Sequence, residues 1–224
     1  MKLFRLALVL TTAAFLAATS HAESCCKPEP KPEPKTEPAP CCPPDQPAAN
    51  PHAGHTELPA ATFSRESLYQ LDVAYTTDAD QTYQLGQLRG QPVVLAMFFA
   101  SCGYACPLIV ADMTRLRDSL PADQRARPAL VLVSFDVARD TPAALAQYRA
   151  SRLLDAQWTL LHGNDDAVRE LAALLGVKFK QEADGQFAHS NLITILNAEG
   201  EIVHQRAGLQ GGLAEAAAAL AALP

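Results

Sequence analysis

The chain has 224 residues, of which 49% are hydrophobic and 19% charged, and its formal net charge is −6. These values exclude a wholly disordered or fibrous chain. The acidic balance also argues against nucleic acid as a partner, because a nucleic-acid-binding protein needs a basic face to neutralise phosphates.

The first 22 residues have the pattern of an export signal. Two positive charges within Met1–Arg5 precede an apolar run from Leu6 to Thr19, and Ser20 and Ala22 are the small residues of a cleavage site. The apolar run is shorter than the roughly 20 residues that a membrane-spanning helix needs. We therefore predict a signal peptide over residues 1–22 and a periplasmic protein, with a membrane anchor as the alternative if the signal is not cleaved.

Residues 23–60 are predicted to be a Pro/Cys-rich disordered linker. Within it, Lys27–Pro40 has proline at nearly every second position, which excludes a helix and favours polyproline II. At ~3.1 Å per residue this segment spans roughly 43 Å, so the Cys-Cys pairs on either side of it are expected to act separately. They are either auxiliary ligands for a soft metal or incidental parts of a spacer. The possible ligands here are Cys25, Cys26, Cys41, Cys42, His52 and His55.

Residues 61–224 are predicted to form one folded domain, in which strands alternate with helices. Two continuous apolar runs, PVVLAMFFA and ALVLVSF, are typical of strands that are buried on both faces. The strands are predicted over Leu71–Thr76, Gln81–Gln84, Pro92–Ala100, Ala129–Phe135, Trp158–Leu161, Leu192–Leu196 and Glu201–Gln205. The helices are predicted over Pro107–Leu120, Pro142–Arg152, Asp165–Leu175 and Leu213–Leu223. Thr141 is the expected N-cap of the second helix, and Gly176 is expected to end the third.

This order of elements predicts the fold class. Strands that alternate with helices give an α/β sandwich, and a final hairpin followed by a helix is the order of a thioredoxin-like domain. We therefore expect a thioredoxin-like sandwich with a central mixed sheet. The two short strands around Asp78–Asp80 are expected to form an N-terminal β-hairpin.

Cys102 and Cys106 are the first candidate site residues. Cys102 follows a buried strand and Cys106 lies at the start of the next helix, so a spacing of about one helical turn lets both sulfurs face the same side. The positive end of the helix dipole favours thiolate over thiol, and thiolate is the form that binds soft metals or attacks disulfides. The alternative is a plain structural disulfide or a buried pair.

His189 is the third candidate. In a thioredoxin-like fold the loop before the strand Leu192–Leu196 faces the dithiol and usually contains a cis-proline, whereas this chain has His189-Ser190-Asn191. Two thiolates and an imidazole suit copper(I), or copper(II) with a further weak ligand, whereas structural zinc sites use four ligands. Magnesium and calcium are excluded because they take oxygen ligands.

Asp136 and Asp140 follow the second buried strand at the same edge of the predicted sheet. Either carboxylate could orient a metal ligand or meet a partner. The alternative is equally good: the two aspartates have only local structural roles, in the turn after the strand and as a negative charge at the start of the next helix.

At these residues the sequence resembles the Sco/SenC family of copper-binding thioredoxin-fold proteins, over roughly Tyr69 to Leu209. Cys102–Pro107 is similar to the family's CxxxCP motif, Ser134–Pro142 to its SxDPxRDTP segment, and His189 to its ligand histidine. The chain departs from the pattern at Val137, where the family has proline, and in having only neutral residues between the two cysteines.

The resemblance implies that Cys102, Cys106 and His189 hold copper. It also implies a metallochaperone for the dinuclear copper centre of cytochrome c oxidase, with a copper-accepting oxidase subunit or other copper protein as partner. A thiol reductant is a possible second partner, because oxidation of the cysteine pair could gate copper binding. The pattern favours a binding protein over an enzyme. A thiol-disulfide oxidoreductase and a copper-scavenging or stress-protection protein remain as alternatives, and a peroxidase is a weaker one.

Overall fold

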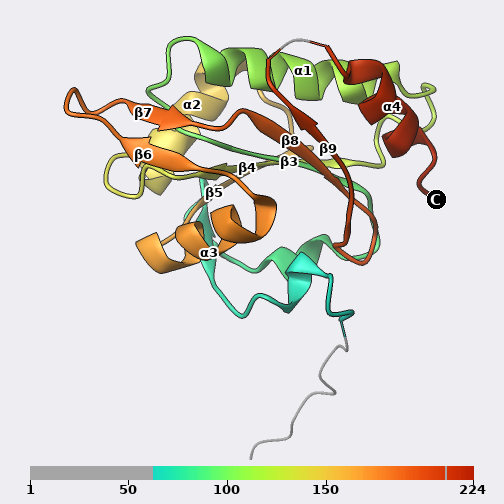
Figure 1. Cartoon of the computed structure of the whole chain (residues 1–224), viewed down its shortest axis with the longest axis horizontal. Coiled ribbons are helices and arrows are strands. Elements are labelled where there is room, and N and C mark those ends of the chain that lie inside the picture. The colour runs from blue at the N-terminus through green and yellow to red at the C-terminus, as the bar shows by residue number, and fades with distance from the viewer. Residues whose placement is uncertain (1–62, 210) are drawn as a thin grey trace, which may run out of the picture. The chain divides into compact units, whose positions relative to one another are not determined.

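A seven-stranded mixed sheet forms the centre of the fold in the computed structural model, which describes residues 63–209 and 211–224 (Figure 1). The strands run in the order β2-β1-β5-β4-β3-β8-β9. They are β1 (Tyr75–Thr77), β2 (Thr82–Tyr83), β3 (Val93–Phe98), β4 (Ala129–Ser134), β5 (Trp158–His162), β8 (Leu192–Leu196) and β9 (Ile202–Ala207). The helices are α1 (Ala105–Ser119), α2 (Pro142–Arg152), α3 (Asp165–Leu175) and α4 (Leu213–Ala221), with short 3₁₀ turns η1 (Leu68–Gln70) and η2 (Leu85–Leu88). The predicted signal peptide and linker lie outside the described residues.

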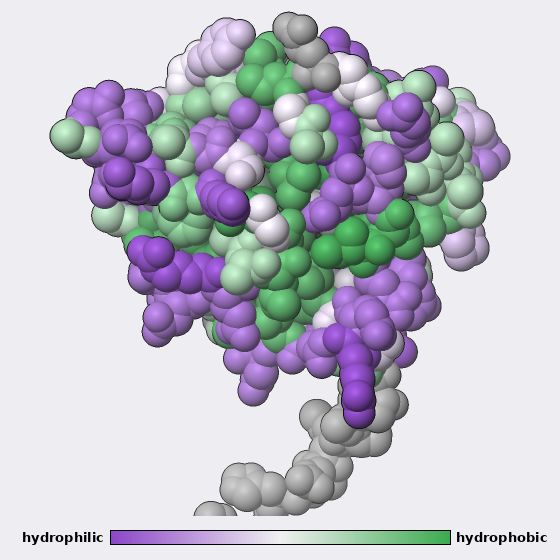
Figure 2. Space-filling model, viewed as in Figure 1, coloured by the Kyte–Doolittle hydropathy of each residue, from purple (hydrophilic) through white to green (hydrophobic). Residues whose placement is uncertain are grey.

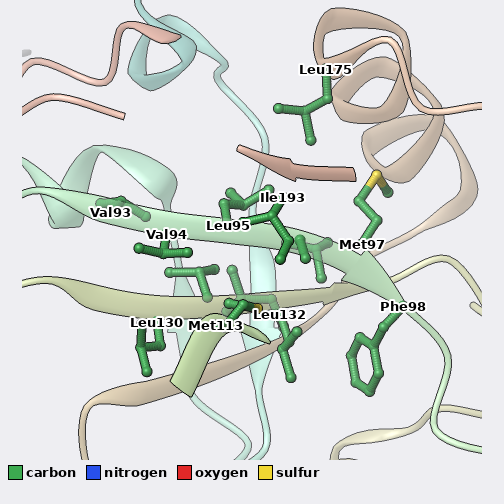
Figure 3. Packing of buried hydrophobic residues seen from close by; sticks show 14 of the residues in the cluster. Val93, Val94, Leu95, Met97, Phe98, Met113, Leu130, Leu132, Leu175 and Ile193 are labelled. Atoms are coloured by element: carbon green, nitrogen blue, oxygen red, sulfur yellow. The ribbon is translucent and has the colours of Figure 1, made fainter. Parts of the chain in front are cut away.

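The core forms around β3 and β4 because both strands are apolar along their whole length. Every residue of the two strands is buried, and they pair in parallel with Val94 opposite Leu130. Figure 3 shows Met113 of α1 on one side of β3 and Leu175 of α3 on the other. Helices therefore cover both faces of the sheet, which confirms the predicted α/β sandwich with a mixed sheet.

Local sequence signals set the ends of α2 and α3. The Thr141 hydroxyl accepts a hydrogen bond from the N–H of Ala144 (3.3 Å), and α2 begins at the next residue, Pro142, as predicted. α3 ends at Gly176, which adopts the left-handed conformation with φ of 73°, also as predicted. Of the helices within the described part of the chain, none has the length and apolar character to cross a bilayer.

Most predicted strands and helices end within one or two residues of the observed ones, and two of the differences have a clear local cause. α1 begins at Ala105 rather than at Pro107, because a proline within the first turn removes an N–H that has no intrahelical acceptor anyway. Of the expected strand Leu71–Thr76, only the last two residues lie in a strand, because η1 ends just before it at Gln70, residues 71–74 are neither helix nor strand, and β1 begins at Tyr75. The N-terminal hairpin itself is confirmed, since β1 pairs antiparallel with β2.

One hairpin was not predicted from the sequence. β6 (Phe179–Gln181) and β7 (Phe187–His189) form a separate two-stranded antiparallel sheet (Figure 1). His189 is the last residue of β7 and lies opposite Phe179. It therefore belongs to a strand and not to the open loop that the sequence pattern suggested.

A buried ion pair joins α1 to β9. Arg206 donates from Nη1 to the Asp112 carboxylate (2.5 Å), and these two side chains are only 3% and 1% exposed. The Nε of Arg206 donates to the carbonyl oxygen of Gly211 (2.8 Å), and Arg115 is a second, exposed partner of Asp112. The pair fixes the last strand of the sheet to the helix that carries Cys106 in its first turn.

Replacing Arg206 with Met should lower the free energy of unfolding by about 3 kcal/mol, because the Asp112 carboxylate would lose its buried partner. Urea unfolding under reducing conditions measures this loss. The Arg115→Met control should change the stability by less than about 1 kcal/mol, because that partner is exposed. Equal losses in the two variants would show that the buried pair is not the stronger contact.

Candidate metal centre

Three side chains with metal-ligating atoms meet at the end of β3. The sulfurs of Cys102 and Cys106 and a ring nitrogen of His189 all lie within 4.8 Å of one another. Cys102 follows β3, Cys106 lies in the first turn of α1, and His189 ends β7. The structure thus brings together the three residues that the sequence nominated, from three separate elements.

The position of Cys102 follows from the tight connection between β3 and α1. The N–H of Cys102 donates to the carbonyl oxygen of Phe99 (3.2 Å), which turns the chain directly after the strand. The N–H of Cys106 then donates to the sulfur of Cys102 (3.3 Å). Tyr104, the N-cap residue of α1, makes no capping bond with its side chain, so the Cys102 sulfur takes over the acceptor role at this helix end.

The two thiols differ in acidity. Burial tends to raise the pKa of Cys102, but hydrogen bonds from the backbone of Cys106, Tyr104 and Ala105 outweigh burial and leave the pKa below its ordinary value. Burial strongly raises the pKa of Cys106, which is fully buried, whereas Cys102 is 8% exposed. Cys102 is therefore the better thiolate and the more accessible of the two.

The imidazole of His189 is held in one orientation. Its Nδ1 lies 3.1 Å from the carbonyl oxygen of Ser190, so the tautomer with a proton on Nδ1 donates to that oxygen and leaves Nε2 free to bind a metal. The ring packs against Phe99 and Phe135, with centroid distances of 5.8 and 5.1 Å. These contacts restrict the rotation of the ring and exclude water from one side of it.

An aromatic cluster lies beside His189, and the sequence pattern did not predict it. Its members come from the end of β3, the end of β4 and the β6–β7 hairpin, and their ring centroids lie 5.1–6.4 Å apart. They are Phe99, Phe135, Phe179 and Phe187. The available signal was a phenylalanine in each strand of the unpredicted hairpin. An apolar shell of this kind lowers the local dielectric around a bound metal and tunes its redox potential.

Asp140 and Asp136 lie close to the site but outside its cluster of donor atoms. The Asp140 carboxylate accepts hydrogen bonds from the backbone N–H of Ala100 (2.7 Å) and the hydroxyl of Ser134 (2.6 Å). It thereby fixes the segment that leads to Cys102, and burial raises the pKa of Asp140 above its ordinary value. Asp136 is also buried and pairs with Arg139.

The donor set fits a soft ion. Two thiolate sulfurs and an imidazole nitrogen match copper(I), and three ligands leave a coordination position open for exchange. Zinc in a structural site would need a fourth ligand, and the described residues within 4.8 Å supply none. The predicted auxiliary ligands Cys25, Cys26, Cys41 and Cys42, like His52 and His55, lie outside the described residues and stay predictions.

Comparison with known proteins identifies relatives of the chain. A protein-family model described as SCO1/SenC matches residues 65–223. A protein of Stutzerimonas stutzeri to which copper binding has been attributed is 32% identical over 136 residues, which are 58% of this chain and 66% of that protein. The match thus spans about two thirds of the length of this relative.

Solved structures share the fold. Copper-bound ScoI of Bradyrhizobium japonicum superposes with a TM-score of 0.54 at 22% identity, covering 66% of this chain and 94% of that one. A SCO1/SenC family lipoprotein of Bacillus anthracis superposes with a TM-score of 0.60 at 18% identity, covering 70% and 96%. These similarities confirm the predicted thioredoxin-like fold.

The difference between the two thiols predicts the order in which they react. In the reduced, metal-free protein, iodoacetamide at neutral pH should alkylate Cys102 well before Cys106, because thiolate is the reactive form and Cys106 is buried. Peptide mass spectrometry after short exposures measures the order. Faster modification of Cys106 would contradict the assigned acidities.

Proposed function

The chain belongs to the SCO1/SenC family, and from this premise we propose that it is an exported copper metallochaperone. It holds one copper ion through Cys102, Cys106 and His189. It supports assembly of the dinuclear copper centre of cytochrome c oxidase. The observation that carries the proposal is the meeting of two sulfurs and a ring nitrogen within 4.8 Å.

Each ligand has a separate part in capture and release. The Cys102 thiolate, stabilised at the helix start and less deeply buried than Cys106, makes the first bond to incoming copper. Cys106 and the Nε2 of His189 then complete a three-ligand site. Because one coordination position stays open, a ligand of the recipient can bind before the chaperone's own ligands leave, so copper passes by exchange.

The relatives support copper as the cargo, since ScoI of Bradyrhizobium japonicum has been solved with copper bound. We propose a copper-accepting oxidase subunit or another copper protein as recipient, and a thiol reductant that keeps the cysteines reduced. The signal-like sequence at residues 1–22 supports delivery outside the cytoplasm, and one structural relative is described as a lipoprotein. The cysteines between residues 25 and 42 would give extra copper capacity, which stays a prediction.

A copper(I) titration against a chromophoric competitor tests the site. The probe is the full chain with its four tail cysteines replaced by serine, so that only Cys102 and Cys106 remain as thiols. It should bind one copper(I) tightly. Cys102→Ser and Cys106→Ser should each abolish tight binding, and His189→Ala should weaken it at least about tenfold, because each removes a ligand.

His204→Ala is the matched control, because His204 lies on β9 and not in the cluster. It should bind copper(I) like the parent. Unchanged affinity in His189→Ala would remove His189 from the site. Absence of tight binding in the parent would contradict the proposed function.

A thiol-disulfide oxidoreductase is the second candidate, and the acidity difference between the two thiols favours it. Cys102 would attack a partner disulfide to form a mixed disulfide and release one partner thiol. Cys106 would then displace the second partner thiol, which leaves the partner reduced and the Cys102–Cys106 pair oxidised to a disulfide. Neither step involves a bond to His189.

The variant His189→Ala therefore distinguishes the metallochaperone from the oxidoreductase. If the chain is an oxidoreductase, His189→Ala should exchange with a small aromatic disulfide at about the parent's rate, because the thiolate stays at the helix start. Absorbance of the released aromatic thiol measures the rate. A parent that binds copper but does not exchange with the disulfide would leave only the metallochaperone.

A further inference from the structure

The β6–β7 hairpin needs an anchor, because it carries His189 but pairs with no strand of the main sheet among the described residues. Its two strands pack through Phe179 and Phe187 on Phe135, with centroid distances of 5.1 Å each. Its tip is different: Glu182, Ala183 and Asp184 are exposed, and Figure 2 shows hydrophilic residues at this end of the molecule. Apolar burial therefore cannot hold the tip.

Arg139 reaches the tip from the loop after β4. Its Nη2 donates to the carbonyl oxygen of Gly185 (2.5 Å), in the turn between β6 and β7. Its guanidinium carbon lies 5.8 Å from the centroid of the Phe187 ring, two residues before His189. A Cβ atom at Gly185 would lie 3.2 Å from Arg139, so glycine permits this close approach.

Arg139 is itself fixed by Asp136. Its Nε donates to the carboxylate of Asp136 (2.5 Å), which is 1% exposed. The N–H of Asp136 donates to the hydroxyl of Ser134 (3.0 Å), the last residue of β4. A continuous set of hydrogen bonds thus runs from the end of a central strand to the turn of the hairpin that presents His189.

We propose that Arg139 is a positioning residue for copper binding, which holds the hairpin so that the His189 imidazole stays close to Cys102 and Cys106. The inference rests on the proposed function. Arginine suits the role because its planar fork donates to the carboxylate and to the carbonyl oxygen at once, whereas a lysine ammonium cannot span both acceptors in the same way. Holding the ligand in place before copper arrives lowers the ordering cost of binding.

Arg139→Met tests the proposal in the chain with four serines in place of its tail cysteines. Copper(I) affinity should fall about tenfold, and Arg139→Lys should recover only part of it. Arg169→Met is the matched control. Arg169 lies 5.6 Å from the ring centroid of Phe179 in the same hairpin and pairs with Asp165, but has no hydrogen bond to the hairpin backbone among the described contacts. The copper(I) affinity of Arg169→Met should stay within about twofold of that of the parent.

A double-mutant cycle with His189→Ala separates positioning from a general structural role. If Arg139 acts through His189, Arg139→Met should cost no further affinity once the imidazole is gone. An additive loss, or equal losses in Arg139→Met and Arg169→Met, would overturn the proposal.

Amide hydrogen exchange of the metal-free protein gives a readout independent of copper. Exchange across residues 179–189 should be faster in Arg139→Met than in the parent and the Arg169→Met control, while β3 and β4 stay protected. Unchanged exchange in the hairpin would overturn the inference even if the parent bound no copper. A parent that binds no copper, together with faster hairpin exchange in Arg139→Met, would overturn the roles of Arg139 and His189 in copper binding. Arg139 would then only stabilise the hairpin.

Discussion

The hydrogen bond from the N–H of Cys106 to the sulfur of Cys102 (3.3 Å) is the interaction on which the site depends. It places a sulfur at the start of α1, where unpaired backbone N–H groups and the helix dipole favour negative charge. The same turn buries Cys106 within reach of Cys102. A single tight connection between a strand and a helix thus produces one acidic thiol and one shielded thiol without a charged side chain between them.

The rest of the fold serves to hold that connection and to bring an imidazole to it. β3 is buried on both faces, which holds its end in place. The Asp140 carboxylate accepts hydrogen bonds from the N–H of Ala100 and from the hydroxyl of Ser134 at the end of β4, and so links the two strand ends. The third ligand comes from a hairpin outside the main sheet, which aromatic packing and polar contacts fix in place. Two ligands on one strand-helix connection and a third on a separately anchored hairpin suit the capture and release of copper that we propose.

Sequence patterns predicted the elements with strong local signals. The apolar runs of β3 and β4, the Thr141 cap and the glycine after α3 each act within a few residues, and these parts were confirmed. The β6–β7 hairpin was missed because its strands have three residues each, and their stability comes from aromatic contacts with distant segments. The contacts of Arg139 and Phe135 with the hairpin could not be predicted either, because they join segments that are far apart in the sequence. The three candidate ligands could be nominated because the expected fold places their chain positions at one edge of the sheet.

X-ray absorption spectroscopy of the copper(I)-loaded full chain, with its natural tail cysteines, tests whether Cys102, Cys106 and His189 hold the copper. At one copper per chain, we expect copper bonded to two sulfurs and one nitrogen in the parent, and to two sulfurs without that nitrogen in His189→Ala. A first shell of three or four sulfurs would place the copper on the tail cysteines and would contradict the assignment of Cys102, Cys106 and His189.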